Sequence, residues 1–286
     1  MLDSTGERFL PWIEGAQIHY EHLHRYAFAA QLVKGKKKVL DLACGEGYGP
    51  YMLSKEAEYV VGIEINEPVV NHAKSRYSPG NLEFIQGSIL EVPIEEEREF
   101  DVIVCFEGIE HVAEHNNLLS EVKRLLRDDG LLIMSTPNKL TFTDDPGVHN
   151  PFHVKELYFD EFKSLLGNYF KNTNFLGQRV YAASNLWDLS PREYSSYKEF
   201  VIGRGEKEFY LSESELKVPL YFIALASDAD LEPYVSTINN SWLVDISNTL
   251  LKYYEKRIIG LCGALQAKDA QINQLQIQMQ RIHNEA

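Results

Sequence analysis

Short apolar runs alternate with segments of helical periodicity between about residues 38 and 137. The runs are rich in β-branched residues and bounded by Gly, Asp or Pro, which is typical of buried strands. They cover residues 39–45, 58–65, 82–87, 100–106 and 131–137. Helices are expected between them at 48–55, 67–77 and 116–126, and the last is followed by a turn signal at Arg127–Gly130. Strand–helix repetition of this kind predicts a doubly wound α/β domain with a parallel sheet and helices on both faces.

The pattern becomes irregular after Pro137. Residues 138–151 are rich in Thr, Asp, Asn, Pro and Gly and are expected to form a long functional loop. A helix is predicted at 159–170, and strands at 174–183 and 220–228 would complete the sheet, with an antiparallel direction left open. Residues 185–217 mix aromatic and charged residues and support no assignment.

The C-terminal segment has apolar residues at steps of three and four up to the end of the chain. This is the a/d pattern of a coiled coil over more than four heptads, interrupted by one lysine, and it favours self-association through residues 245–286. The alternative is one long amphipathic helix packed on its own domain. Whether the natural chain continues beyond Ala286 is left open. The seam consists of Leu251, Tyr254, Ile258, Leu261, Leu265, Lys268, Ile272, Leu275, Met279 and Ile282.

Charge and cysteine content narrow the function. The 286 residues include 28 Lys and Arg against 42 Asp and Glu, a net charge of −14, which disfavours a nucleic-acid partner. The three cysteines form no C-x-x-C pair and suit a reducing compartment. No signal-peptide pattern and no apolar run of roughly 20 residues is present. We therefore expect a cytoplasmic protein, with a position at the inner face of the membrane left open.

A glycine-rich turn follows the first expected strand in the segment VLDLACGEGYG, residues 39–49. Glycines there let the backbone approach a ligand closely at the start of a helix. The dinucleotide pattern G-x-G-x-x-G fails, because Pro50 occupies the last position. Glu64 ends the next strand, where a carboxylate can accept both ribose hydroxyls of a nucleoside. An acid at that place does not by itself distinguish the cofactor.

The G-x-G-x-G spacing after Asp41 resembles the first motif of the class I S-adenosylmethionine-dependent methyltransferases, with Ala43 in place of its first glycine. The resemblance implies a Rossmann-like methyltransferase fold and S-adenosylmethionine as cofactor. It implies that Glu64 binds the ribose, that Ile65 packs on adenine, and that Ser88 and Ile89 contact the adenine edge. The complete set of expected cofactor-binding residues is Tyr20, His24, Tyr26, Asp41, Ala43, Gly45, Gly47, Glu64, Ile65, Ser88, Ile89 and Phe106.

The fourth strand runs into Phe106-Glu107-Gly108-Ile109-Glu110-His111-Val112, which resembles the F-E-x-I-E-H-V segment of O- and N-methyltransferases. Methylation of a hydroxyl benefits from a base that is aligned to remove its proton. Histidine is the side chain whose unperturbed pKa lies nearest the operating pH. His111 is therefore the preferred general base, although it could only shape the pocket. Glu107 would orient this base or bind substrate, and Glu110 is assigned to the substrate. Either could also be a solvated acid of a first helical turn.

The loop at 138–155 contains a second cluster of polar residues. Residues 135–138 (STPN) and 150–157 (NPFHVKEL) resemble substrate-facing segments of glycan-modifying methyltransferases. Asn138, His149 and Asn150 are expected to contact the acceptor, and His153 is an alternative base. His and Asp residues of this loop could hold a divalent metal, but nothing in the sequence fixes the spacing of the ligands, so no metal is assigned.

The N-terminal segments GERF (6–9) and HLHRY (22–26) resemble parts of methyltransferases from bacterial surface-polysaccharide loci, that is, of O-antigen or S-layer glycan assembly. We expect a helical lid at 1–35, a methyltransferase domain at 36–235 and the coiled coil at 245–286. The expected activity is O-methylation of a glycan hydroxyl, which could cap the chain, with fusion to or association with glycosyltransferases left open. The alternatives are a small-molecule O- or N-methyltransferase and a non-catalytic scaffold.

Overall fold

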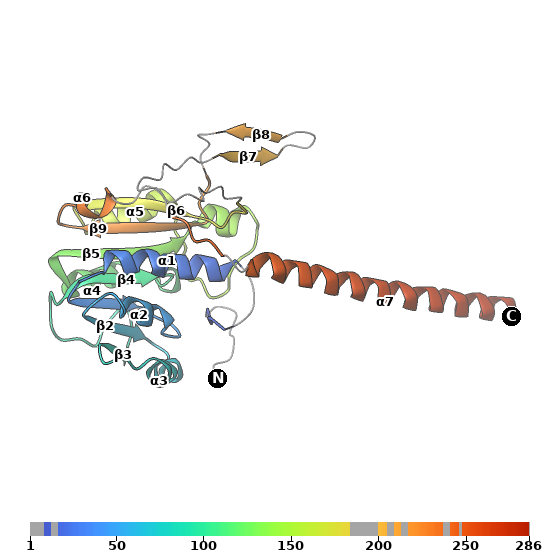
Figure 1. The fold of residues 1–286 in the computed structure, drawn as a ribbon, viewed down its shortest axis with the longest axis horizontal. Helices are drawn as coiled ribbons and strands as arrows, with labels where there is room; N and C mark the ends of the chain where they lie inside the picture. The colour runs from blue at the N-terminus through green and yellow to red at the C-terminus, as the bar shows by residue number, and fades with distance from the viewer. Residues whose placement is uncertain are drawn as a thin grey trace, which may run out of the picture.

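The computed structural model describes residues 9–12, 17–183, 200–204, 209–212, 217–236, 241–245 and 248–285 (Figure 1). Its centre is a seven-stranded sheet in the order β3-β2-β1-β4-β5-β9-β6. Adjacent strands from β3 to β5 are parallel, while β9 is antiparallel to both of its neighbours. The doubly wound α/β prediction is therefore confirmed, and so is the antiparallel direction that the sequence left open.

Most strands of this sheet are buried, but the two edge strands, β3 and β6, are largely half-buried or exposed. In chain order the strands are β1 Lys38–Leu42, β2 Tyr59–Glu64, β3 Leu82–Gln86, β4 Phe100–Phe106, β5 Leu126–Pro137, β6 Asn172–Gln178 and β9 Tyr221–Ser227. A separate antiparallel hairpin pairs β7 Val201–Arg204 with β8 Phe209–Ser212. The ends of β1, β2, β4 and β5 meet at one edge of the sheet, which is called the carboxyl edge below.

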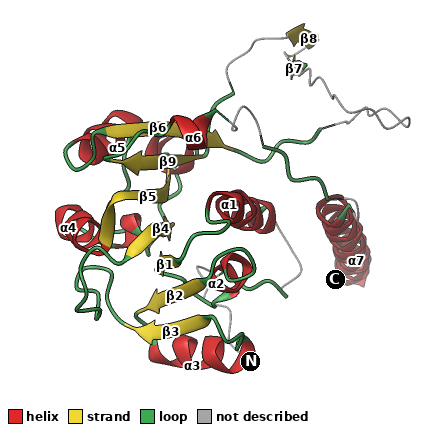
Figure 2. Ribbon diagram, turned by 60° about the vertical axis from the view of Figure 1, so that its left-hand side comes forward, coloured by secondary structure: helices red, strands yellow, loops and turns green. Residues whose placement is uncertain are grey.

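Helices cover both faces of the sheet (Figure 2). One face carries α1 Ile18–Leu32, α2 Tyr48–Leu53 and α6 Glu232–Val235, packed over an apolar core that includes Phe28, Leu53 and Leu231. The other carries α4 His115–Leu125 and α5 Phe159–Gly167, whose core includes Leu119 and Phe162. Helix α3, Glu67–Arg76, begins at the Asn66 cap and packs Val70 and Ala73 against Phe84. Two short turns, η1 Ile109–His111 and η2 Leu140–Asp144, follow β4 and β5.

The C-terminal helix α7 runs over Thr249–Glu285 and projects away from the sheet (Figure 1). The single long helix is as predicted, and it does not pack along the domain as the alternative required. Its seam positions are exposed, for example Leu261 at 63% and Leu265 at 62%. Among the residues that the structure describes, no helix has the length and hydrophobicity needed to cross a bilayer.

Two predicted boundaries are wrong. Arg127–Gly130 is not a free turn but lies within β5, where Leu126 pairs with Phe100 and Leu131 with Val102, so that the four residues bulge out of register. Strand β6 ends at Gln178, opposite Tyr221, because β9 offers no partner to residues 179–183. The loop at 138–151 contains the wide turn η2, in which Asp145 N donates to Leu140 O at 2.8 Å. Most of 185–217 lies outside the described residues.

The turn between β1 and α2 requires left-handed backbone at three residues. Ala43 has φ +58°, Gly45 +56° and Gly47 +99°. A Cβ on Gly45 would meet nothing within 4 Å, whereas one on Gly47 would lie 2.8 Å from Ala73 Cβ and 2.9 Å from Phe84 Cζ. Gly47 is therefore required both by backbone conformation and by the close approach of α3 and β3, while Gly45 is required by conformation alone.

This difference predicts unequal costs for two alanine substitutions. Gly45→Ala adds only the left-handed penalty of roughly 1–2 kcal/mol, which lowers Tm by about 3–6 °C in a domain of this size. Gly47→Ala adds steric overlap and is expected to lower Tm by more than about 10 °C. Thermal unfolding of the ligand-free variants measures both values. Equal losses would contradict the packing argument.

Candidate active site

Glu64 links the end of β2 to the glycine turn. Its Oε2 accepts a hydrogen bond from Gly45 N at 3.1 Å, and its Oε1 accepts one from Asn66 N at 3.0 Å. A carboxylate has about four lone-pair sites, so both oxygens can still accept hydroxyl protons. Glu64 therefore has the position and the free acceptor capacity that a ribose-binding acid needs.

The residues expected at the adenine edge lie next to this carboxylate. Ile65 is 68% exposed, although it is a large apolar residue at the carboxyl edge of the sheet. Ser88 follows β3, where Gly87 N donates to Glu64 O at 3.0 Å, and Ser88 Oγ accepts a hydrogen bond from Leu90 N at 3.1 Å. Ile89 is half-buried. An exposed apolar side chain beside a hydroxyl suits a flat ring with a polar edge.

Helix α1 contacts the same edge through Tyr26. The Tyr26 hydroxyl donates to Asp41 Oδ2 at 2.9 Å, and its ring makes edge contacts with Tyr48 and Phe106 at centroid distances of 5.2 and 5.0 Å. Asp41 is fully buried, and its Oδ1 has no hydrogen-bond partner among the described residues. Burial raises the pKa of Asp41 to about 8, against the lowering effect of the Tyr26 hydrogen bond.

The other two residues expected in α1 make different contacts. The Tyr20 hydroxyl bonds to Asp245 and accepts a hydrogen bond from Leu250 N at 2.9 Å, and His24 Nε2 lies 2.9 Å from Ser241 Oγ. Both side chains thus contact the segment that leads into α7. The structure brings Tyr26, and not Tyr20 or His24, together with Asp41 at the glycine turn.

Sequence reasoning missed Arg25, which is only 1% exposed. Its Nη1 donates to Gln178 Oε1 at 2.7 Å, and its guanidinium carbon lies 4.8 Å from the centre of the Tyr221 ring. Its Nε and Nη2 have no hydrogen-bond partner among the described residues. Burial disfavours the charge, but nearby Glu107 and Tyr221 hold the pKa of Arg25 above its usual value. Gln178 and Tyr221 lie more than 150 positions away, so only the fold reveals the group.

A buried guanidinium with two unused donors fits a carboxylate of a ligand, because Arg binds carboxylates through parallel hydrogen bonds. S-adenosylmethionine carries a ribose, an adenine and such a carboxylate. The buried unpaired donors of Arg25, the acceptors of Glu64 and the glycine turn therefore fit this cofactor.

The turn after β4 is strained at Glu107, whose φ is +51°. Ser135 fixes this residue by donating to Glu107 Oε1 at 2.6 Å and accepting from Glu107 N at 3.2 Å. Glu110 follows in η1 and is fully buried, and neither of its carboxylate oxygens has a hydrogen-bond partner among the described residues. Burial, followed by the charge of Glu107, raises the pKa of Glu110 well above its usual value.

His111 and His153 meet beside Glu110, at a ring-centroid distance of 5.2 Å. His111 is exposed, and its Nδ1 lies 3.0 Å from Phe152 O. His153 is buried, with Nδ1 2.6 Å from Glu156 Oε1 and Nε2 3.1 Å from Asn150 Nδ2. The structure therefore brings both predicted base candidates into one cluster, together with Glu110 and Asn150.

Asn138 makes its hydrogen bonds outside this cluster, and His149 directly precedes Asn150 in the loop. Asn138 is buried, with Nδ2 donating to Pro219 O at 3.0 Å and Oδ1 accepting from Leu140 N at 3.3 Å. These bonds hold the chain between β5 and β9, so the amide acts as a backbone clamp here. His149 is exposed in the turn that follows η2.

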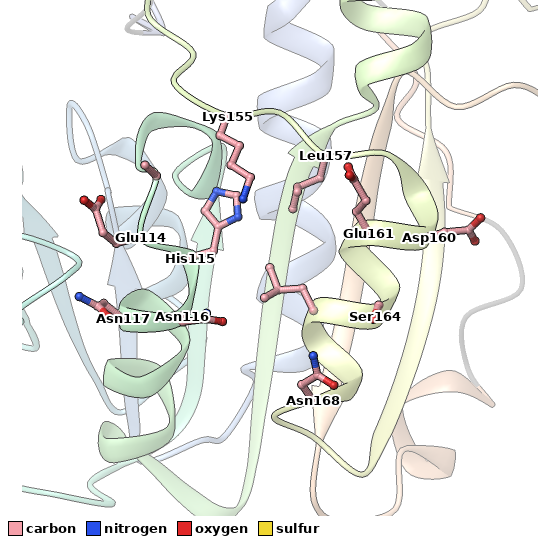
Figure 3. Close-up of a pocket in the computed structure, with 12 residues that line it drawn as sticks. Glu114, His115, Asn116, Asn117, Lys155, Leu157, Asp160, Glu161, Ser164 and Asn168 are labelled. Atoms are coloured by element: carbon pink, nitrogen blue, oxygen red, sulfur yellow. The ribbon is translucent and has the colours of Figure 1, made fainter.

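A cavity of about 710 Å³ lies between the start of α4 and α5 (Figure 3). His115 and Lys155 line it together with the acidic side chains of Glu114, Asp160 and Glu161. None of the residues that line it belongs to the expected cofactor, catalytic or substrate residues. The residues that the sequence predicts for the chemistry therefore lie at the carboxyl edge of the sheet and not in the lining of this cavity.

Comparison with known proteins agrees with this assignment. A family profile described as "Methyltransferase domain" matches residues 33–179. A probable S-adenosylmethionine-dependent methyltransferase of Mycobacterium tuberculosis is 36% identical over 176 residues, which are 58% of this chain and 60% of that protein. This chain thus spans less than two thirds of that relative. A probable S-adenosylmethionine-dependent methyltransferase of Mycolicibacterium smegmatis is 33% identical over 216 residues, 71% of this chain and 78% of that protein.

More distant matches agree on the fold and on the class of enzyme. A ubiquinone biosynthesis O-methyltransferase of Pasteurella multocida is 30% identical over 135 residues, 43% of this chain and 56% of that protein. The crystal structure of a SAM-dependent methyltransferase of Thermotoga maritima superposes with a TM-score of 0.51 at 14% identity, over 73% of this chain and 90% of that one. The chain belongs to the class I S-adenosylmethionine-dependent methyltransferases, and S-adenosylmethionine is its cofactor.

Proposed function

We propose that the protein transfers a methyl group from S-adenosylmethionine to a hydroxyl oxygen of a sugar in a bacterial surface glycan. The observation that carries the proposal is the cluster of Glu110, His111 and His153 beside the cofactor-binding edge. Such a cluster can remove the proton that makes a hydroxyl a poor nucleophile. The ubiquinone biosynthesis enzyme among the relatives is named as an O-methyltransferase, which supports oxygen as the acceptor atom.

The cofactor supplies a methyl group on a positively charged sulfur, so the protein has mainly to align the acceptor oxygen with it. In our proposal Glu64 binds the ribose, Ile65, Ser88 and Ile89 contact the adenine, and Arg25 binds the carboxylate. Tyr26 and Phe106 form the wall beside Asp41. The turns at Ala43, Gly45 and Gly47 admit the cofactor close to the backbone.

The histidine cluster acts on the acceptor. Phe152 O can only accept a hydrogen bond, so the 3.0 Å contact makes His111 Nδ1 the donor and leaves a lone pair on Nε2. Because His111 is exposed, an acceptor hydroxyl can reach that nitrogen from solvent. We propose that His111 Nε2 acts on the hydroxyl, and that Asn150 and His149 contact neighbouring hydroxyls from the loop.

The acceptor class separates this proposal from its alternatives. The glycan rests on the resemblance of residues 6–9 and 22–26 to polysaccharide-locus methyltransferases, on that of residues 150–157 to glycan-modifying methyltransferases, and on the predicted coiled coil. This is an argument by analogy. A small-molecule O- or N-methyltransferase would have the same cofactor contacts. Methyl transfer to a quinone or other phenol, and to no deoxyhexose-terminated acceptor, would overturn the glycan. A scaffold without activity would bind the cofactor and transfer nothing.

We also propose that α7 joins two or more copies of this chain, and that the chain comprises a lid at 1–35, a methyltransferase domain at 36–235 and the helix at 245–286. The proposal for α7 is supported by its exposed seam and by its position away from the sheet. Such a stalk would place the enzyme beside glycosyltransferases that extend the same glycan.

Ligand binding at the cofactor site should stabilise the folded protein. S-adenosylhomocysteine at 100 times its Kd adds about 2.7 kcal/mol to folded-state stability, which raises Tm by about 5–10 °C. NADH is expected to give no shift. Glu64→Ala should reduce the shift, and Glu67→Ala, at an exposed residue three positions on, should leave it unchanged. A shift that survives Glu64→Ala intact would contradict the ribose assignment.

Loss of His111 from the histidine cluster should slow methyl transfer. His111→Ala is expected to lower kcat for methyl transfer to the hydroxyl acceptor about 10²- to 10³-fold, because the oxygen must then react without help in losing its proton. Val148→Ala, at a residue of the same loop that is 65% exposed, is the control and should change kcat by less than about threefold. Both variants should keep the S-adenosylhomocysteine shift. Equal activity of the two variants would remove His111 from the mechanism.

Charged residues on the seam of α7 should prevent self-association. The double variant Leu261→Glu, Leu265→Glu places charges on the seam and is expected to convert an oligomer into a single chain. Ile259→Glu changes an equally apolar residue off the seam, 72% exposed, and should leave the oligomer intact. Light scattering after size exclusion measures the mass. A wild-type protein that elutes as a single chain would refute the coiled coil.

A further inference from the structure

Glu110, His111 and His153 each offer a ligand atom, and these atoms all lie within 4.8 Å of one another. Two imidazoles and one carboxylate are a donor set that proteins use for divalent transition metals. We propose that these three side chains bind one divalent cation, and that the acceptor hydroxyl binds at an open position of that cation. The inference rests on the proposed function and concerns how the cluster activates the hydroxyl.

Glu110 gives the first independent support. Its carboxylate is fully buried, and both oxygens lack a hydrogen-bond partner among the described residues. A buried carboxylate without hydrogen bonds is costly, and it is normally paired or coordinates a metal. Glu107 adds a like charge nearby and Arg25 an opposite one, but neither donates a hydrogen bond to the Glu110 carboxylate. A cation bound to Glu110 would give this carboxylate a direct partner.

The histidines have the hydrogen bonds that metal-bound histidines usually have. A ligating imidazole almost always donates its second N–H to a carbonyl or a carboxylate, which fixes the tautomer. His111 Nδ1 does so to Phe152 O at 3.0 Å, and His153 Nδ1 to Glu156 Oε1 at 2.6 Å. Glu156 is held in turn by Thr143 Oγ1, which donates to its Oε2 at 2.6 Å. Both Nε2 atoms therefore carry the lone pair that a cation needs.

One contact must change when the cation binds. Asn150 Nδ2 lies 3.1 Å from His153 Nε2 and donates to that lone pair. Asn150 also accepts from Phe152 N at 3.0 Å through Oδ1, so the amide can move off the imidazole while its loop contact remains. In this structure the amide therefore occupies His153 Nε2, and it has to move before a cation can bind to that nitrogen.

The backbone holds the two halves of the site together although they are about 40 residues apart. Val154 N and Lys155 N both donate to Glu110 O, at 2.8 and 3.0 Å. These bonds fix the loop that carries His153 against the turn that carries Glu110 and His111. The fold itself therefore brings the three side chains together, and cation binding requires only that the Asn150 amide moves and that the ligand atoms close in from separations of up to 4.8 Å.

The donor set also indicates the class of cation. Mg²⁺ prefers oxygen ligands in near-ideal octahedral geometry, whereas imidazole suits transition metals such as Zn²⁺ or Fe²⁺, and mixed sites also accept Mn²⁺. Because His111 is exposed, the cation would keep positions open to solvent or acceptor. This open side distinguishes the site from a closed structural one.

The cation would lower the pKa of a bound hydroxyl, as it lowers that of bound water. The hydroxyl loses its proton to solvent at the exposed side of His111. The oxygen then forms a bond to the methyl carbon while the carbon–sulfur bond breaks, and the bonding pair stays on sulfur as a neutral thioether. In this form His111 Nε2 would be a ligand of the cation and would take no proton itself, so the cation would replace the direct base of the proposed function.

The test measures metal binding directly. The full chain is stripped with a chelator and titrated with Mn²⁺, with calorimetry and electron paramagnetic resonance as readouts and Mg²⁺ as the comparison cation. Wild type is expected to bind one Mn²⁺ per chain, more tightly than Mg²⁺. Glu110→Gln, which keeps the shape and removes the charge, should weaken Mn²⁺ binding at least tenfold, and His153→Ala should do the same. His149→Ala should bind as wild type does.

The controls separate folding, metal and function. Each variant must keep its S-adenosylhomocysteine shift, which shows that the sheet and the cofactor edge are intact. Stoichiometric binding that Glu110→Gln leaves unchanged, or no binding by wild type, would overturn the metal site. Methyl transfer to a hydroxyl that persists in stripped protein would leave the proposed function standing and remove the cation from it. Bound Mn²⁺ without methyl transfer to any hydroxyl would do the reverse.

Discussion

The structure depends on one constraint: parallel strands deliver their carboxyl ends to the same edge of a sheet. Strands β1, β2 and β4 place Ala43, Glu64 and Phe106 at that edge, and β5 adds Ser135. Residues separated by up to about 90 positions thus become neighbours. The turn after each strand lies outside the ladder of hydrogen bonds, so it can expose backbone or a charged group. The residues assigned to the cofactor therefore gather at this edge.

The same edge collects buried charge, which must be balanced. Arg25, Asp41 and Glu110 are all at most 1% exposed, and each has at least one polar atom without a hydrogen-bond partner among the described residues. Sheet cores elsewhere in the molecule, such as those around Leu119 and Phe28, are apolar. Unpaired buried polar groups are costly, so their concentration at one edge is typical of a site completed by ligands. The left-handed backbone of Ala43 and Glu107 at the same edge has the same explanation.

The sequence predicts the parallel strands well because each is a short buried run between turn residues. It fails where pairing with a partner strand decides the boundary, as at Arg127–Gly130 and at Gln178. In the site, Glu64, Glu110 and His111 are predictable because Glu64 ends β2 and the other two lie within five residues of the end of β4. Arg25 was missed because it looks like a surface residue of a helix rich in histidine and tyrosine. Its environment comes from Gln178 and Tyr221, which no local pattern connects to it.

The role of His111 is decided by its neighbours. A lone histidine at the start of a helical turn would serve as a direct base. Here a second imidazole and a buried carboxylate lie within 4.8 Å, and both rings turn their Nδ1 toward acceptors. Two imidazole nitrogens and a carboxylate oxygen within 4.8 Å of one another bring three electron-pair donors together. They form a good arrangement for a cation, which satisfies all three groups at once.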